Sequence, residues 1–309
     1  MKLTKNDFAS SFGIDPSEIN RDTEQIINQL NFEIVKIVDD ERDDLILRII
    51  EKIRFDEQVI AAPERKNVWE RGWAENLAEY IESRGNLETL VPKFIRKGEI
   101  IRWFGDYYRT LDENFELNYI SVLRSFLFSK YFGKIDSLYE FGAGTGFNLV
   151  HAGSIRPEIK LVGTDFVQSP VDLMNRVGND LKINLSAQVF DMLEPKKSNL
   201  QLDLNSGVLT FGSLEQLGSK LSNMIQYLIN ENPSVCVHIE PMIEMYDVSN
   251  LPDYLASWFQ SKRGYSSGLI SLLEDLSLQG KLEILEVQRL NFGSLMMEGY
   301  NLIAWRPKK

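Results

Sequence analysis

A glycine-rich turn after a short apolar segment constrains the fold of this chain more than any other feature. Residues 138–141 read Leu-Tyr-Glu-Phe, and three glycines follow at alternate positions: Gly142, Gly144 and Gly146. Apolar residues then recur at helical spacing, which predicts a strand, a tight turn and a helix. Glycine lets the backbone bend sharply and approach a ligand closely, and the start of a helix presents free N–H groups. The sequence therefore predicts a ligand-binding turn where a strand ends.

The spacing of these glycines differs from that of dinucleotide-binding turns. In those turns, Gly-x-Gly-x-x-Gly sets a helix N-terminus against a pyrophosphate. Here the spacing is Gly-x-Gly-x-Gly, and the acidic Glu140 stands two positions before the first glycine. This arrangement favours a ligand other than a dinucleotide.

The pattern of the chain changes near residue 133. Before it, apolar residues recur mostly at helical spacing; after it, short apolar runs alternate with helical patterns, which is typical of a parallel sheet covered on both faces. The runs are Ser137–Phe141, Lys160–Thr164, Ala187–Phe190, Gly207–Phe211, Ser234–Ile239, Leu282–Val287 and Tyr300–Trp305. We therefore predict an α/β fold over residues 131–309, a doubly wound, seven-stranded, mostly parallel sheet with an antiparallel C-terminal hairpin. A helical N-terminal region over residues 1–130 precedes it.

Acidic residues stand at the ends of the first three predicted strands. Glu140 is in the first, Asp165 closes the second and Asp191 follows the third. The carboxyl ends of parallel strands meet at one edge of a sheet, where such folds bind ligands. An acid at the end of the second strand is placed to accept hydrogen bonds from ribose hydroxyls.

From about residue 130 onward, the sequence resembles the class I, Rossmann-like S-adenosylmethionine-dependent methyltransferases. Their first motif is Glu/Asp-x-Gly-x-Gly-x-Gly, and residues 140–146 match it at every defined position. The resemblance implies S-adenosyl-L-methionine as the cofactor, with the glycine turn against its methionine part and ribose. The cofactor-binding residues that it implies are Glu140 at the amino group, Gly142, Ala143, Gly144 and Gly146 in the turn, Asp165 at the ribose, Phe166 beside the adenine, Asp191 at the adenine amino group and Met192 as its apolar neighbour.

Three residues near the ends of the fourth and fifth predicted strands are candidates for catalysis. Glu215 follows the fourth strand, in a loop that faces the transferred methyl group in this family, but an acid in the first turn of a helix is the alternative. Glu240 ends the fifth strand as a candidate base or substrate ligand. His238 is a candidate base for O-methylation, although strand alternation also favours packing between sheet and helix. No cluster of metal ligands stands out, so no metal site is predicted.

Aromatic and basic residues gather in the N-terminal region. One group includes Trp69 and Trp73, and another includes Trp103, Tyr107 and Tyr108. They predict either an aromatic core or a lid over the methyl-transfer site, with Trp103, Tyr107 and Tyr108 at the substrate. Arg263, after the fifth strand, is a further candidate substrate residue, with a solvated loop as its alternative.

The composition of the chain disfavours some classes of binding partner and some cellular settings. Lys and Arg total 34 and Asp and Glu total 45, so the net charge of −11 disfavours nucleic acid. No apolar run is long enough for a membrane span. The single cysteine, Cys236, permits no intrachain disulfide, which fits a reduced cytoplasmic setting.

The resemblance and these patterns together predict methyl transfer to a small molecule, with an O-nucleophile on a sugar or secondary metabolite as the narrower expectation. A protein or peptide methyltransferase is the alternative enzyme. A non-catalytic scaffold that keeps the cofactor fold is the alternative of another class. The oligomeric state is left open.

Overall fold

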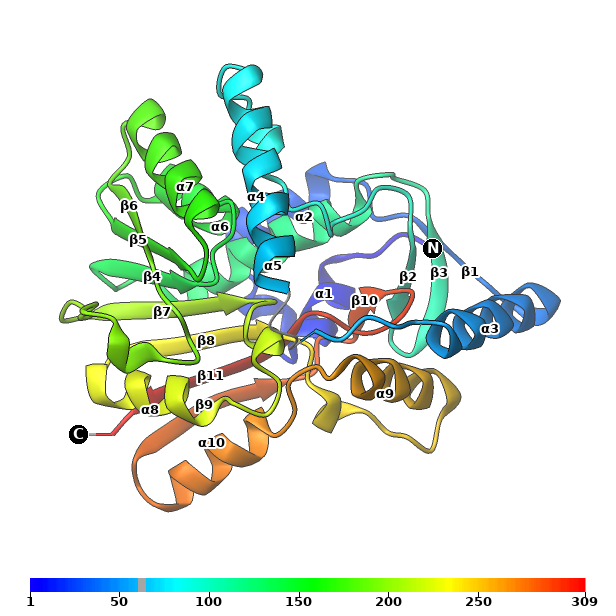
Figure 1. Ribbon diagram of the computed structural model, residues 1–309. Helices are drawn as coiled ribbons and strands as arrows, with labels where there is room; N and C mark the ends of the chain where they lie inside the picture. The colour runs from blue at the N-terminus through cyan, green and yellow to red at the C-terminus, as the bar shows by residue number, and fades with distance from the viewer. Residues whose placement is uncertain (61–64, 309) are drawn as a thin grey trace.

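A computed structural model describes residues 1–60 and 65–308 of the chain. Its main sheet has seven strands in the order β6-β5-β4-β7-β8-β11-β9 (Figure 1). The strands are β4 (Ser137–Phe141), β5 (Lys160–Asp165), β6 (Leu185–Val189), β7 (Ser206–Phe211), β8 (Val235–Glu240), β9 (Leu282–Gln288) and β11 (Asn301–Pro307). Strands β4 to β8 pair in parallel, whereas β11 is antiparallel to both β8 and β9. The predicted doubly wound sheet with an antiparallel C-terminal hairpin is confirmed.

The strands place alternate side chains on two apolar layers because successive residues of a strand point to opposite faces. On β4, Leu138 belongs to one buried cluster and Tyr139 to the other. Helices α5 (Phe115–Tyr131) and α6 (Phe147–Ile155) cover the Leu138 face, and α8 (Ser222–Glu231) and α10 (Leu269–Leu278) cover the Tyr139 face. Helix α7 (Gln168–Leu181) packs against β5 and β6. Of the helices in the described ranges, none combines the length and apolarity needed to cross a membrane.

The N-terminal region is not purely helical. Its helices are α1 (Lys5–Phe12), α2 (Arg21–Gln29), α3 (Asp39–Arg54) and α4 (Arg65–Glu82). It also supplies β1 (Ile34–Lys36), β2 (Ile100–Trp103) and β3 (Asp106–Thr110), which join β10 (Phe292–Ser294) in a second sheet of order β1-β3-β2-β10. The region was predicted to be mostly helical, and its three short strands are an addition to that prediction.

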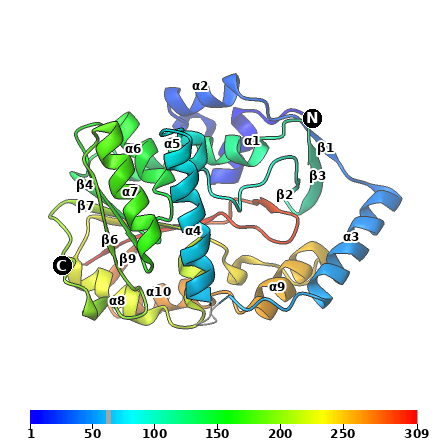
Figure 2. The ribbon, with the colours of Figure 1, turned by 45° about the horizontal axis from the view of Figure 1, so that its top comes forward.

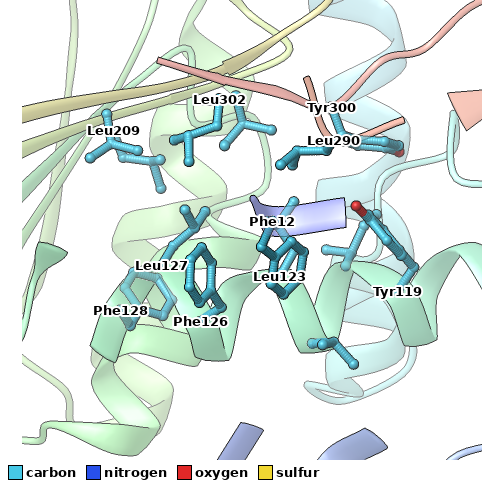
Figure 3. Close-up of a cluster of buried hydrophobic side chains, with 14 of the residues drawn as sticks. Phe12, Tyr119, Leu123, Phe126, Leu127, Phe128, Leu209, Leu290, Tyr300 and Leu302 are labelled. Atoms are coloured by element: carbon cyan, nitrogen blue, oxygen red, sulfur yellow. The ribbon is translucent and has the colours of Figure 1, made fainter. Parts of the chain in front are cut away.

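Helix α5 connects the N-terminal region to the main sheet. Figure 3 shows its aromatic and leucine side chains in one cluster with Phe12 of α1 and with Leu209 and Leu302 of the sheet. The rings of Phe12 and Phe126 stack with their centres 4.5 Å apart. Side chains from before and after residue 130 therefore share one continuous buried cluster.

Candidate active site

The glycine turn has the conformation that its sequence predicts. Gly142, Gly144 and Gly146 have positive φ angles of 71°, 53° and 75°, which side chains rarely tolerate. A Cβ atom on Gly142 would collide with Ser213, and one on Gly144 would lie 2.8 Å from the Trp73 ring. The turn is thus bare because other parts of the chain come close to its backbone.

One cavity of about 370 Å³ lies over the carboxyl ends of the central strands. Helix α4 crosses this edge of the sheet (Figures 1 and 2). Eight of the predicted cofactor residues line it: Glu140, Gly142, Ala143, Gly144, Asp165, Phe166, Asp191 and Met192. Gly146 is the exception, because it lies one step further on, where it caps α6 and packs against Met174. We call the wall formed by these eight residues and Asn148 the cofactor half.

Glu140 and Asn148 form a buried polar corner of the cofactor half. The Asn148 Nδ2 group donates to Glu140 Oε1 at 2.7 Å. Glu140 Oε2 and Asn148 Oδ1 are both shielded from solvent and accept no hydrogen bond from any described residue. Burial raises the pKa of Glu140 to about 8, against the smaller opposing effects of Asn148 and Arg124. Glu140 Oε2 and Asn148 Oδ1 are therefore two neighbouring acceptors without a donor. A positively charged group beside them would favour the ionised form of the Glu140 carboxylate.

Asp165 stabilises the glycine turn from the end of β5. Its Oδ2 accepts the Gly144 backbone N–H at 3.2 Å, and its Oδ1 accepts that of Val167 at 3.4 Å. Burial raises its pKa to about 7, although these backbone donors act in the opposite direction. Asp191 is more exposed, and its Oδ1 accepts the Leu193 backbone N–H at 2.8 Å.

Helix α4 forms a roof over the cavity. Trp69 and Trp73 line the cavity and stack on each other, with ring centres 5.8 Å apart. Glu70, between them, accepts the backbone N–H groups of Gln168 and Ser169 at 3.0 and 3.3 Å. Since these N–H groups open helix α7, the Glu70 carboxylate caps that helix and fixes the roof to the main domain.

His238 lies outside the cavity, so its assignment as a base is corrected. Trp305 Nε1 donates to its Nε2 at 2.9 Å, which leaves the proton on Nδ1, 2.8 Å from Thr210 Oγ1. Burial lowers the pKa of His238 to about 3, so the ring is neutral and both nitrogens have partners. The alternative prediction, packing between strands and their covering layer, describes its position.

Glu240 and Glu215 are absent from the cavity lining as well. The Glu240 carboxylate accepts the backbone N–H groups of Ser213, Leu214 and Glu215, and burial raises its pKa to about 7. Glu240 therefore stabilises the loop after β7 through its backbone N–H groups and does not line the cavity. The Glu215 carboxylate accepts Nε2 of Gln216 at 2.8 Å, and Gln216 is the residue that lines the cavity.

The substrate positions proposed for Trp103, Tyr107, Tyr108 and Arg263 are also corrected. Trp103 and Tyr108 are buried in the core around α1 and α5, and Tyr107 lies in the cluster between α3 and α9 (Leu251–Arg263). The Arg263 guanidinium pairs with Asp56 and lies 4.5 Å from the Phe259 ring centre. These three aromatic rings are therefore buried in two separate cores, and none of them lines the cavity.

Much of the remaining lining comes from residues that the sequence did not single out, and it also includes Ser213 and the exposed Lys66 and Lys220. Segment 92–95, helix α5 and the loop after β7 supply side chains that are mostly apolar. We call this wall the acceptor half, and its residues are Pro92, Phe94, Ile95, Ile120, Phe211, Gln216 and Leu217. Within residues 1–60 and 65–308, no group of three His, Cys, Asp or Glu side chains is arranged to hold a metal ion.

Comparison with known proteins gives structural matches only. No family model and no curated protein matches the sequence. The cyclase SpnF matches with a TM-score of 0.50 and 12% identity, over 77% of this chain and 95% of its own. Geranyl diphosphate C-methyltransferase from Streptomyces coelicolor A3(2) has a TM-score of 0.47 and 15% identity, over 76% and 98%. PigF with S-adenosylhomocysteine has a TM-score of 0.46 and 12% identity, over 86% and 70%.

These identities are too low to transfer an activity, and the likeness concerns the fold. The strand order and the antiparallel β11 agree with it. The chain has the class I, Rossmann-like methyltransferase fold.

Proposed function

We propose that the chain binds S-adenosyl-L-methionine in the cofactor half and transfers its methyl group to a small-molecule acceptor. The observation that carries this proposal is the set of acids at three adjacent strand ends around one cavity: Glu140, Asp165 and Asp191. A cationic amine, a ribose and an adenine amino group all offer donors to such acceptors.

The donor chemistry of this wall fits the cofactor group by group. Glu140 Oε2 and Asn148 Oδ1 are the two unpartnered acceptors that its ammonium group would fill. Asp165 would accept from the ribose hydroxyls, and Phe166 and Met192 would border the adenine. The glycine spacing of the turn differs from the Gly-x-Gly-x-x-Gly of pyrophosphate-binding turns, which disfavours a dinucleotide.

The sulfonium of the bound cofactor would supply an activated methyl group. The protein then has to hold the acceptor in line and exclude water, and positioning of this kind accounts for much of the rate enhancement in such reactions. The roof of Trp69 and Trp73 and the apolar acceptor half are suited to that task. The cavity beneath α4, at about 370 Å³, has the size of a small-molecule site, which supports a small acceptor.

Transfer of labelled methyl from S-adenosyl-L-methionine tests the reaction. We expect label in a metabolite extract and not in the protein fraction of a lysate. Label in protein would favour the peptide methyltransferase. Cofactor binding without transfer to either fraction would favour a scaffold or another reaction on this fold, as the cyclase SpnF illustrates. A cytoplasmic setting and the absence of a nucleic-acid partner remain predictions from composition.

A further inference from the structure

The second half of helix α4 is anchored to the main domain. The helix packs beside α7 (Figures 1 and 2). Tyr80 belongs to a buried apolar cluster with Leu173 and Val177 of α7. Asn76 is also buried, and its Nδ2 group donates to the Thr89 carbonyl oxygen at 3.0 Å. Packing and a hydrogen bond therefore hold this half of the helix in place.

The first part of α4, residues 65–71, is attached in a different way, and we call it the gate. No side chain of residues 66–71, all of which the structure describes, is buried. The Glu70 carboxylate is instead bound at the start of α7, where it accepts the backbone N–H groups of Gln168 and Ser169 and, at 2.5 Å, the Ser169 hydroxyl. A polar contact at a helix end thus holds the gate, where apolar burial holds the second half.

A glycine separates the gate from the anchored half of the helix. Gly72 lies inside α4, and nothing stands within 4 Å of the position that its Cβ atom would take. Its backbone is helical, so neither close packing nor a positive φ angle requires a glycine here. Glycine inside a helix is less favourable than alanine, because it loses more backbone freedom on folding. Gly72 therefore weakens α4 at the boundary of the gate.

The gate lies beside the part of the cavity that would hold the nucleoside. Lys66 and Trp69 of the gate line the cavity, and so do Asp165 and Phe166. The start of α7, to which Glu70 binds, follows Phe166 within three residues. A cofactor whose ribose lies at Asp165 would therefore be next to the gate, and its release would depend on whether the gate is closed.

Building on the function proposed above, we propose that Glu70 is a positioning residue that holds the gate closed over the bound cofactor, and that bending at Gly72 opens the gate for exchange. In the closed state, the Glu70 carboxylate accepts from N–H groups at the start of α7, where a negative charge is favourable. Opening replaces these hydrogen bonds by water and separates the stacked rings of Trp69 and Trp73. The anchored half of α4 stays in place.

Exchange rates of S-adenosylhomocysteine test the role of Glu70. Stopped-flow tryptophan fluorescence measures its association and dissociation rate constants, since Trp69 and Trp73 line the cavity. Glu70→Ala should raise the dissociation rate constant about tenfold without slowing association, because the cap on α7 is lost. Glu70→Gln should restore most of the native rate, because its amide oxygen still accepts N–H groups. Glu79→Ala, an exposed position in the anchored half, is the matched control and should change neither rate. A native dissociation rate in Glu70→Ala, or equal increases in both alanine variants, would overturn the proposal.

Gly72→Ala tests the hinge. It should slow association and dissociation alike, each about fivefold, and leave the dissociation constant unchanged, because alanine stiffens the helix without contacting the ligand. In the ligand-free protein, amide hydrogens of residues 69–72 should exchange faster than those of residues 77–82, and Gly72→Ala should reduce that difference. Uniform exchange along α4, or native rates in Gly72→Ala, would overturn the hinge. Hydrogen exchange needs no ligand, so failure of the native protein to bind S-adenosylhomocysteine would count against the proposed function alone.

Discussion

The two halves of the cavity are built in different ways. The cofactor half comes from the ends of β4, β5 and β6 and the turns after them, all within residues 140–192. The acceptor half comes from segment 92–95, α5 and the loop after β7. The first is polar and acidic, and the second is largely apolar. The contrast shows that short motifs within one continuous stretch of the chain can encode a ligand wall, whereas the facing wall depends on how distant segments pack.

The largest expected effect is in the glycine turn. Gly144→Val should weaken S-adenosylhomocysteine binding at least 100-fold, because its side chain would meet Trp73 at a position with φ of 53°. Calorimetry measures the affinity, and thermal unfolding shows whether the fold persists.

Gly280→Val is the control for backbone strain. Gly280 has φ of 73° and nothing within 4 Å of its Cβ position. It should lower stability with little effect on cofactor affinity. Equal affinity losses in the two variants would contradict a specific role for the turn.

The two buried acids of the cofactor half, Asp165 and Glu140, should each bind a different group of the ligand. Asp165→Ala should cost about 1–3 kcal/mol, or roughly 5- to 150-fold, for both S-adenosylhomocysteine and adenosine, because both carry the ribose. Glu140→Gln should weaken S-adenosylhomocysteine by a similar factor and leave adenosine unchanged, because adenosine lacks the amino group. If both variants lost both ligands equally, the assignment of these residues would be wrong.

Proton linkage gives a smaller but more diagnostic effect. Burial raises the pKa of Glu140 to about 8 and that of Asp165 to about 7 in the ligand-free protein. A bound ammonium group favours ionised Glu140, so S-adenosylhomocysteine affinity should rise about tenfold from pH 6 to 8, with proton release near pH 7. Calorimetry in buffers of different ionisation enthalpy measures that release. An unchanged pH dependence in Glu140→Gln would argue against Glu140 as its source.

The same shifts set the sign of the pH dependence of stability. Both folded-state pKa values lie above the ordinary values of 4.5 and 3.8. The folded chain therefore binds more protons than the unfolded chain in this range. The free energy of unfolding of the ligand-free protein should fall as pH rises from about 5 to 8. Urea unfolding should show a shallower fall in Glu140→Gln.

The smallest effect on the cofactor should come from the acceptor half. Phe94→Ala should change S-adenosylhomocysteine affinity less than threefold but lower the transfer of labelled methyl to a metabolite extract about tenfold, since it removes apolar contact area from one half only. Comparable losses of cofactor affinity and methyl transfer would contradict separate cofactor and acceptor halves.

Local sequence patterns were enough to predict the cofactor half of the site. The strand, turn and helix around Gly142 and the acids at strand ends follow from periodicity and short motifs, and the structure brings Glu140, Asp165 and Asp191 to one cavity. Asn148 is one helical turn from the glycines, and its position beside Glu140 becomes clear only when the turn is folded. Trp73 lies far earlier in the chain, so no local pattern connects it with Gly144.

The hairpin of β2 and β3 shows why other predictions were wrong. Its turn has Phe104 and Gly105, both with positive φ, in place of the Asn-Gly pair that usually signals such a turn. Its aromatic residues come in two adjacent pairs, Trp103-Phe104 and Tyr107-Tyr108, and in the sequence they looked like one clustered surface. Its outer partner β10 lies almost 190 residues further along the chain, beyond the reach of any local pattern. Glu240 was misassigned because a strand end offers the same acid to a ligand or to neighbouring backbone N–H groups.

Calorimetric titration of the full chain with S-adenosyl-L-methionine and, in parallel, with NAD tests the central claim most directly. The account predicts saturable one-to-one binding of S-adenosyl-L-methionine, with proton release near pH 7, and no binding of NAD. Tight binding of NAD would contradict the account. So would a titration with S-adenosyl-L-methionine that gives no heat of binding and shows no competition by S-adenosylhomocysteine.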